Sequence, residues 1–263
     1  MSKKEITLNE MRQLQIGLLD EIHAFCTKNS IRYSLTGGSL IGAVRHKGYI
    51  PWDDDIDIML PRPDYEKFLK EFVPSKEYVK LQSLHTDDTY CYPFAKVYDT
   101  RTVLIEYGAK NGIYVDVFPI DGWPDKKDVD AFYDDFLRIN KLVTKTTAFY
   151  KFRKHPLLYK IKYYLKKIFY PSRSKVLSML DDLFARYPFE KAEYVGGVVG
   201  SYGKKESVPR TVFQMYTTLS FEGKEYSCIS GYDTYLSTVY GDYMQLPPKE
   251  KQVSHHVFEA YWI

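Results

Sequence analysis

The sequence lacks several features that would identify a particular class of protein. Its three cysteines, Cys26, Cys91 and Cys228, are odd in number, far apart and without C-x-x-C spacing, so neither a disulfide framework nor a thiolate metal site is indicated. We expect reduced cysteines that pack in the interior. No run of about 18 apolar residues could span a bilayer, and the first residues lack the apolar segment of a signal peptide. The expected compartment is the cytoplasm.

The sequence also has no large excess of positive or negative charge. The 263 residues carry a net charge of only +3, so we expect no nucleic-acid partner. Hydrophobic residues make up 44% and charged residues 27%, as in an ordinary soluble protein, whereas the aromatic fraction of 16%, with 25 Tyr, is high. Surfaces rich in tyrosine are typical of contacts with sugars, bases or membrane interfaces.

The N-terminal third predicts a helix, a strand, a glycine turn and a second helix. Thr7 and Glu10 have the form of a capping box, and apolar residues then recur at helical spacing to Phe25. Residues 31–36 alternate as a strand does and run into Gly37-Gly38-Ser39, after which a short helix should end near Gly48.

The next segments predict a mixed α/β core. In residues 55–60 acidic and apolar residues alternate with period two, which predicts a strand that Pro61 and Pro63 end. Asp64 should cap a helix through Phe72. Three further strands are expected, at Phe94–Tyr98, Thr102–Tyr107 and Tyr114–Phe118. Beyond them we expect helices to about residue 187 and then glycine-rich turns at Gly196-Gly197 and Gly200.

The acidic strand predicts a metal site. Residues i and i+2 of a strand project from one face, so Asp55 and Asp57 can converge on one ion. Mg²⁺, or Mn²⁺ as the alternative, suits carboxylates combined with substrate phosphates. Asp116 lies in another predicted strand and is the third candidate ligand. The alternative interpretations are a solvated acidic loop for the first pair and an edge-strand residue for Asp116.

The glycine turn predicts a phosphate cradle. Gly37 and Gly38 leave the backbone free of Cβ atoms, and Ser39 at a helix start offers a hydroxyl group beside backbone N–H groups. The alternative is an ordinary tight turn. Asp53 and Asp54 are expected to organise the neighbouring turn through side-chain hydrogen bonds to backbone N–H groups, with Asp53 the better candidate for a role in the site.

Several segments together resemble one family. The longest is LTGGSLIGAVRHKGYIPWDDDIDIMLPRPDYEKF, from Leu35 to Phe68, and shorter ones are FAKVYDTRT, YVDVFPIDG, FEGKEYSCI, YDTYLSTVYGDYMQLPP and SHH. They resemble the LicD/fukutin family of phosphotransferases, within the nucleotidyltransferase-like superfamily that includes polymerase β. The resemblance covers nearly the whole chain. It implies an α+β fold in which helices flank the mixed sheet of a nucleotidyltransferase-like core.

The resemblance also implies an activity, namely transfer of a phosphorylated alcohol from a CDP-linked donor to a sugar hydroxyl, with release of CMP. The typical cargo is phosphocholine from CDP-choline, phosphoribitol being an alternative, and the acceptor is a cell-surface glycan, such as teichoic acid or lipopolysaccharide, or its lipid-linked precursor. The family's metal positions fall on Asp55, Asp57 and Asp116. Two other interpretations stay open: a nucleotidylyltransferase that acts on a small molecule or sugar, and a non-catalytic scaffold that binds glycan or lipid.

Five basic or imidazole side chains are candidates for contacts with the nucleotide or substrate. Arg45, His46 and Lys96 could offset the charge of the leaving nucleotide. For the first two, compensation of a helix dipole is the alternative, and for Lys96 it is a solvent-exposed strand position. His255 and His256 could donate hydrogen bonds to phosphate, or lie on the surface without a role.

A basic segment follows the predicted core. Residues 151–175 contain nine Lys or Arg and no acidic residue, and an apolar helical stripe from Leu157 to Ile168 is typical of a helix that lies on anionic lipid. A helix packed on the core is the alternative. We therefore predict a catalytic core at residues 1–125, a helical basic segment at 126–190 with possible contact to the inner membrane face, and a C-terminal module at 191–263 that completes the substrate site.

Overall fold

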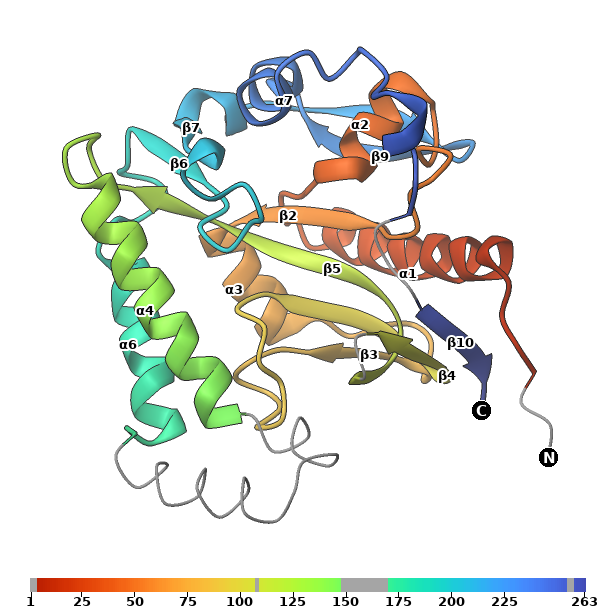
Figure 1. Cartoon of the computed structure of the whole chain (residues 1–263), viewed down its shortest axis with the longest axis horizontal. Coiled ribbons are helices and arrows are strands. Elements are labelled where there is room, and N and C mark those ends of the chain that lie inside the picture. The colour runs from red at the N-terminus through yellow and green to blue at the C-terminus, as the bar shows by residue number, and fades with distance from the viewer. Residues whose placement is uncertain (1–3, 107–108, 148–169, 255–257) are drawn as a thin grey trace.

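The computed structural model describes residues 4–106, 109–147, 170–254 and 258–263. Among them, eight strands form one mixed sheet, two more form a hairpin, and helices pack around both (Figure 1). This confirms the expected α+β class. The helices are α1 (Leu8–Lys28), α2 (Gly37–Arg45), α3 (Arg62–Glu71), α4 (Val129–Thr147), α6 (Arg173–Ala185) and α7 (Tyr232–Tyr240), with 3-10 turns η2 (Gly203–Glu206), η3 (Arg210–Phe213) and η4 (Lys249–Lys251). The strands are β1 (Ser34–Leu35), β2 (Asp57–Pro61), β3 (Val79–Gln82), β4 (Ala95–Glu106), β5 (Ala109–Trp123), β6 (Tyr194–Gly196), β7 (Val208–Pro209), β8 (Tyr216–Phe221), β9 (Lys224–Ile229) and β10 (Phe258–Trp262).

The sheet has the order β1-β2-β5-β4-β10. β2 and β5 are parallel, and the other neighbours along this order are antiparallel. β3 pairs with β4. β6 pairs with the C-terminal end of β5 on one side and with β7 on the other. Strands from both ends of the sequence therefore meet in one sheet.

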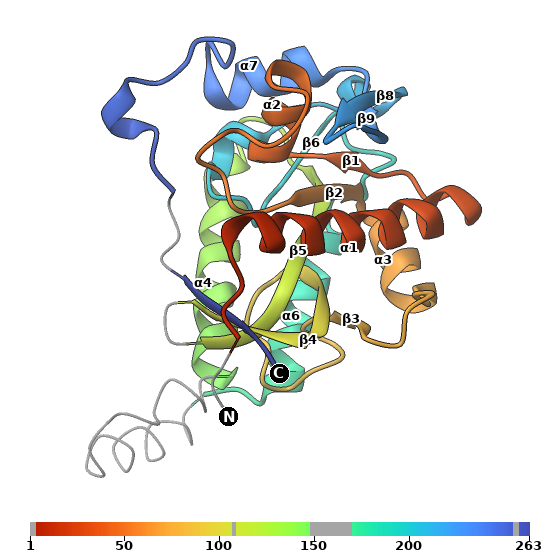
Figure 2. The ribbon, with the colours of Figure 1, turned by 90° about the vertical axis from the view of Figure 1, so that its right-hand side faces the viewer.

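The first helix forms as its sequence predicts. The Thr7 hydroxyl accepts from the Glu10 backbone N–H, and the Glu10 carboxylate accepts from Thr7 N at 2.9 Å, which satisfies two donors at the helix start. Leu19 and Ile22 are fully buried in the main core. Figure 2 shows α1 in front of β5, with α2, α7 and the β8–β9 hairpin gathered beyond β1.

The acidic strand differs from its prediction. β2 starts at Asp57, so Asp55 precedes the strand. Ile58, Met59 and Leu60 are all buried, and alternate burial is therefore absent. The physical reason is position: β2 lies between β1 and β5 inside the sheet and is covered on both faces.

Three other predictions are corrected. α3 starts at Arg62 after the N-cap Pro61, so Asp64 is not the cap; its carboxylate instead accepts from the Arg32 backbone N–H and Nε, each at 2.8 Å. The two strands expected at 94–98 and 102–107 are one strand, β4, whose register shifts between Asp99 and Leu104. β3 was missed although VKLQ alternates apolar and polar residues, because four residues are too few for the pattern to stand out.

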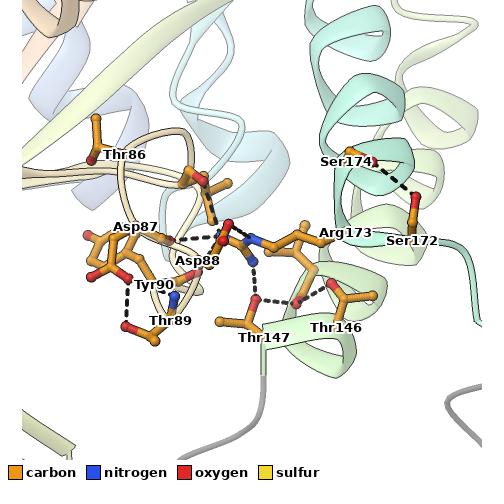
Figure 3. Close-up of polar contacts among 12 residues, drawn as sticks. Thr86, Asp87, Asp88, Thr89, Tyr90, Thr146, Thr147, Ser172, Arg173 and Ser174 are labelled. Atoms are coloured by element: carbon orange, nitrogen blue, oxygen red, sulfur yellow. Dashed lines mark hydrogen bonds and ion pairs between the residues drawn. The ribbon is translucent and has the colours of Figure 1, made fainter.

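The helices expected after residue 124 are present as α4 and α6, which pack on Trp123 in a second core. Arg173 at the start of α6 joins three segments (Figure 3). It donates to the carbonyls of Leu84, Asp87 and Tyr90 at 2.9–3.1 Å and to the hydroxyl of Thr147 at the end of α4.

The predicted membrane segment lies mostly outside the described residues, since seven of its nine basic residues fall between 151 and 167. Arg173 is described, and its guanidinium group contacts the protein itself, at the Tyr90 carbonyl and the Asp88 carboxylate. No helix in the described part of the chain is long and apolar enough to cross a membrane.

Segments of the predicted C-terminal module join the predicted core. β6 pairs with β5, and β10 pairs with β4. The hairpin packs on α1 and α2, and its residues Cys228, Phe221 and Tyr226 are buried in the main core. Cys26 is likewise buried, and all three thiols are free, but Cys91 is only half-buried, so the expected interior position is found for two of the three cysteines. The division at residues 125 and 190 stays a prediction.

Candidate active site

A cavity of about 1240 Å³ lies between the N-terminal glycine turn and the C-terminal segments. One side, which we call the acidic wall, consists of Gly37, Gly38, Asp53, Asp55 and Asp57. The other side, which we call the tyrosine wall, consists of Tyr202, Glu206, Tyr235 and Tyr240. Arg45 and residues 242–253 complete the lining. Ligand sites are commonly clefts of about 300–1,000 Å³, so this cavity is large enough for a small-molecule ligand.

The two glycines of the acidic wall make room for two carboxylates. A Cβ atom on Gly37 would lie 3.3 Å from Asp57 Oδ2, and Gly37 also has a positive φ of 55°. A Cβ atom on Gly38 would lie 2.3 Å from Asp53 Oδ2. The glycine turn therefore cradles acidic side chains at the start of α2, and any phosphate held there would lie beside them.

Ser39 is buried and holds the strand that carries Asp57. Its Oγ accepts from the Asp57 backbone N–H at 2.9 Å, and its residue is only 2% exposed. Ser39 does not line the cavity. The hydroxyl that the sequence assigned to a phosphate thus binds the backbone of the acidic strand.

Asp57 and Asp116 are neighbours across the sheet. They are register partners in the parallel pair β2 and β5, and Lys96 is the partner of Asp116 in β4. Lys96 Nζ lies 2.6 Å from Asp116 Oδ1 and 3.2 Å from the centre of the Tyr114 ring. Lys96 is 4% exposed, so the solvent-facing alternative for it is wrong.

The environment of Asp57 disfavours a negative charge. Burial, followed by the negative charges of Asp55, Asp116 and Asp53, raises its pKa well above the ordinary value, although Lys96 acts in the opposite direction. Crowded carboxylates of this kind are stabilised when a cation neutralises them, and such perturbed groups are enriched in functional sites.

Asp55 also belongs to a tight cluster with the two carboxylates before it. Ligand oxygens of Asp53, Asp54 and Asp55 come within 4.8 Å of one another, and within the described ranges no other set of three or more possible ligands meets this distance. The predicted set Asp55, Asp57 and Asp116 is therefore wider than this cluster. Asp54 is 4% exposed and accepts from Ser254 Oγ at 2.6 Å.

Two side chains of α1 organise the loop that carries these carboxylates. Arg12 donates to the carbonyls of Pro51 at 3.0 Å and Asp53 at 2.5 Å, and Gln15 Nε2 donates to the Asp54 carbonyl at 2.9 Å. With its carbonyls held from behind, the loop presents Asp53 and Asp55 to the cavity. This donor set of hard oxygens fits Mg²⁺ or Mn²⁺.

Arg45 joins α2 to the C-terminal segment. Its Nη1 donates to the Tyr243 carbonyl at 2.5 Å and to the Gln245 carbonyl at 3.3 Å, while the side chain lines the cavity. Burial lowers the pKa of His46, and Arg45 lowers it further. The edge of the His46 ring meets the Trp52 ring, with centroids 6.4 Å apart. His255 and His256 lie outside the described residues.

The sequence did not predict the tyrosine wall. Its centre is Glu206, which is 6% exposed and accepts from the Tyr202 backbone N–H at 3.3 Å. The Tyr235 hydroxyl also interacts with this carboxyl and lies 3.1 Å from Thr36 Oγ1 on the acidic side. Burial raises the pKa of Glu206 to about 7. The available signal is the glycine-rich stretch just before Glu206, whose pattern by itself predicts only turns.

Comparisons with known proteins found relatives that match this chain over half or more of its length. The model of the LicD/FKTN/FKRP nucleotidyltransferase-domain family matches residues 30–155. The lipopolysaccharide cholinephosphotransferase LicD of Haemophilus influenzae is 34% identical across 98% of this chain and 99% of its own length. The ribitol 5-phosphate transferases FKRP of Mus musculus and Homo sapiens are each 25% identical over 140 residues, 50% of this chain and 26% of theirs. The family match contains the acidic wall, and the tyrosine wall lies beyond it.

Proposed function

The chain belongs to the LicD family, and from that premise we propose that it transfers phosphocholine from CDP-choline to a sugar hydroxyl and releases CMP. The observation that carries the proposal is the 34% identity to a lipopolysaccharide cholinephosphotransferase over nearly the full length of both chains. The acceptor in the proposal is a cell-surface glycan or its lipid-linked precursor. The FKRP relatives, named for ribitol 5-phosphate transfer, support a phosphorylated alcohol as the general cargo.

The proposed reaction breaks a phosphoanhydride bond in the donor and forms a phosphate ester bond to the acceptor. The acceptor oxygen forms a bond to the phosphorus that carries the alcohol, and the bond from this phosphorus to the bridging oxygen breaks. CMP leaves with the bonding electrons, and the acceptor hydroxyl gives up its proton. Such transfers depend mainly on positioning and on neutralising charge, and less on a strong base.

Within this reaction the acidic wall would hold a divalent cation. Asp55 and Asp57 are the proposed ligands, and Asp53 is close enough to Asp55 to contribute. Asp116 lies beside Asp57 on the neighbouring strand. Mg²⁺ bound there would neutralise charge on the donor pyrophosphate and would lower the pKa of the acceptor hydroxyl.

We assign the remaining side chains to holding the metal ligands in place and to binding the nucleotide. Lys96 binds Asp116 and fixes its carboxylate, so we assign Asp116 to charge balance and ligand support, not to proton removal. Arg45 places a guanidinium group in the cavity lining, where it can offset charge on the leaving CMP. The cytoplasmic location and the membrane contact of residues 151–175 stay predictions.

A panel of CDP-alcohols tests the proposal. The protein is incubated with CDP-choline, CDP-ribitol or CDP-glycerol, Mg²⁺ and a glycan acceptor, and CMP is measured together with mass analysis of the acceptor. We expect CMP release and an acceptor heavier by phosphocholine. An acceptor heavier by CMP, with release of phosphocholine in place of CMP, would indicate a nucleotidylyltransferase instead, and activity that persists after Asp55→Ala with Asp57→Ala would rule out the proposed site.

A further inference from the structure

The proposed transfer accounts for the acidic wall but leaves Glu206 without a task. This carboxyl lines the cavity, is 94% buried, and has no ion pair with a Lys, Arg or His within the part of the chain that the structure describes. A buried acid without a cationic partner is unfavourable, because desolvation penalises its charged form. Such a group needs either a proton or a positively charged ligand.

The sequence makes special room for this carboxyl. A Cβ atom on Gly200 would lie 1.8 Å from Glu206 Oε1, and one on Gly197 would lie 2.4 Å from Oε2. A Cβ atom on Gly196 would lie 1.9 Å from the Glu206 backbone carbonyl. Three glycines thus allow the backbone to close around one acidic residue, as Gly37 and Gly38 do for Asp57 and Asp53.

Aromatic rings stand beside the carboxyl. Tyr202 and Tyr240 meet edge to face, with ring centroids 4.6 Å apart and planes at 66°, and Tyr202 is 46% exposed. A Cβ atom on Gly37 would lie 3.6 Å from the Tyr240 hydroxyl, so Tyr240 reaches the glycine that also touches Asp57. The tyrosine wall and the acidic wall therefore meet at Gly37.

The cavity as a whole favours cations. Its lining contains six carboxylates and two cationic side chains, Arg45 and Lys251. Three of the six carboxylates, Asp53, Asp55 and Asp57, belong to the acidic wall. The excess negative charge therefore extends beyond the residues that would hold a divalent ion.

We propose that Glu206, Tyr202 and Tyr240 form a subsite for the quaternary ammonium end of the transferred alcohol. The inference rests on the proposed function and adds the part of the site that recognises the cargo. Aromatic ring faces attract ammonium groups, and quaternary ammonium ligands are commonly bound by aromatic cages. One carboxylate surrounded by tyrosines is a poor ligand set for Mg²⁺, which requires several hard oxygens. A neutral polyol would leave the charge of Glu206 uncompensated.

Binding of the free headgroup tests the inference without any transfer. Choline chloride and its neutral isostere 3,3-dimethylbutan-1-ol are titrated into the protein by calorimetry, in the presence of Mg²⁺. We expect choline to bind more tightly than the isostere and at least fivefold more weakly to Glu206→Gln. Tyr202→Leu should weaken binding more than Tyr202→Phe, which keeps the ring. Glu225→Gln, at an exposed position on β9, is the control for removal of a negative charge.

The transfer reaction provides the second measurement. The ratio of kcat/KM for CDP-choline to that for CDP-ribitol should fall at least tenfold in Glu206→Gln. An equal loss with both donors would make Glu206 a merely structural residue and overturn the inference. Choline binding that survives Glu206→Gln but is lost in Asp57→Asn would place the cation at the acidic wall, with the same consequence. If no CDP-alcohol is a donor but choline binding depends on Glu206, the proposed function fails and the subsite stands.

Discussion

The two walls of the cavity use the same local device for different purposes. In each, glycines let the backbone approach a carboxyl that a Cβ atom would displace. On the acidic wall the carboxylates crowd together, and their mutual repulsion adds to burial in raising the pKa of Asp57. On the tyrosine wall a single carboxyl is isolated by aromatic rings, and burial is the largest cause of its raised pKa. Crowded oxygens suit a small, strongly hydrated ion, and an isolated acid among rings suits a large, weakly hydrated one.

The largest effect should follow a change on the acidic wall. Asp57→Asn removes a charge from the proposed metal site, and we expect transfer from every CDP-alcohol to fall by about a thousandfold or more. In the absence of metal the variant should unfold at a higher temperature than the wild type, because the repulsion between carboxylates is relieved. Mg²⁺ should raise the melting temperature of the wild type only, since stabilisation by a ligand depends on binding to the native state.

Thermal unfolding with and without Mg²⁺ provides the check. A wild type whose melting temperature does not respond to Mg²⁺ or Mn²⁺ at millimolar concentration would show that the acidic wall does not bind these ions, and the contrast between the two walls would then be lost.

The two glycine cradles can be compared by matched substitutions. Gly38→Ala would press on Asp53 and Gly200→Ala on Glu206, in both cases against the movable end of a side chain. We expect Gly38→Ala to lower kcat/KM for choline and ribitol donors alike, by roughly tenfold. Gly200→Ala should instead reduce the preference for the choline donor.

Gly17→Ala is the control for these substitutions. Gly17 lies in the interior of α1, and a Cβ atom there would meet no atom within 4 Å. The variant should keep its activity and gain about 0.5–1 kcal/mol of stability, because alanine favours the helix. If Gly38→Ala and Gly200→Ala changed the two donors in the same way, the walls would not have separate roles.

A smaller effect concerns stability and pH. The pKa of Glu206 is raised to about 7, so between its ordinary value and pH 7 the folded state keeps a proton that the unfolded state has lost. Stability contributed by this group therefore falls as pH rises through that interval. The groups that face it, Tyr133, Tyr202, Tyr235 and Tyr240, have raised pKa values and stay neutral there.

Glu206→Gln should remove this pH dependence. Relative to the wild type, the variant should gain about 2 kcal/mol in the free energy of unfolding when the pH is changed from 5 to 8. Urea unfolding of both proteins at the two pH values measures the difference. Saturating choline should reduce it, since a bound cation stabilises the charged form of the wild-type residue. A constant difference between the two proteins would contradict the raised pKa.

The smallest effect is expected at Ser39. Ser39→Ala leaves the Asp57 backbone N–H without its acceptor, which should lower the free energy of unfolding by about 1 kcal/mol. The KM for CDP-choline should change little. A marked rise in KM with unchanged stability would show instead that the hydroxyl binds the donor phosphate, as the sequence suggested.

The parts of the molecule that could be predicted are those in which local pattern and structure coincide. The capping box at Thr7, the glycine turn at Gly37 and the strand after the acidic loop each leave a signal within a few residues, although β2 starts two residues later than its pattern indicates. The neighbourhood of Asp57 and Asp116 followed from two strand patterns, and β2 and β5 indeed pair at that register.

The rest depended on contacts between distant segments. The partner of Ser39 Oγ is an N–H group in another element, and only the packed structure determines it. From the sequence alone, Lys96 occupies a strand position that could face solvent. Only the pairing of β4 with β5 places it opposite Asp116. The glycines before Glu206 carry an ordinary turn signal, because their special requirement is set by a side chain that returns to them from η2.

The hydrogen bond from Arg45 to the Tyr243 carbonyl has a consequence for biosynthesis. During synthesis, α2 and the acidic wall leave the ribosome long before the segment that Arg45 must hold. The cavity is incomplete until α7 and the residues after it have emerged. β10 must then pair with β4. Contacts between such distant segments form late and slow the folding of a domain. A nascent chain therefore lacks the complete cavity until the residues after α7 have emerged.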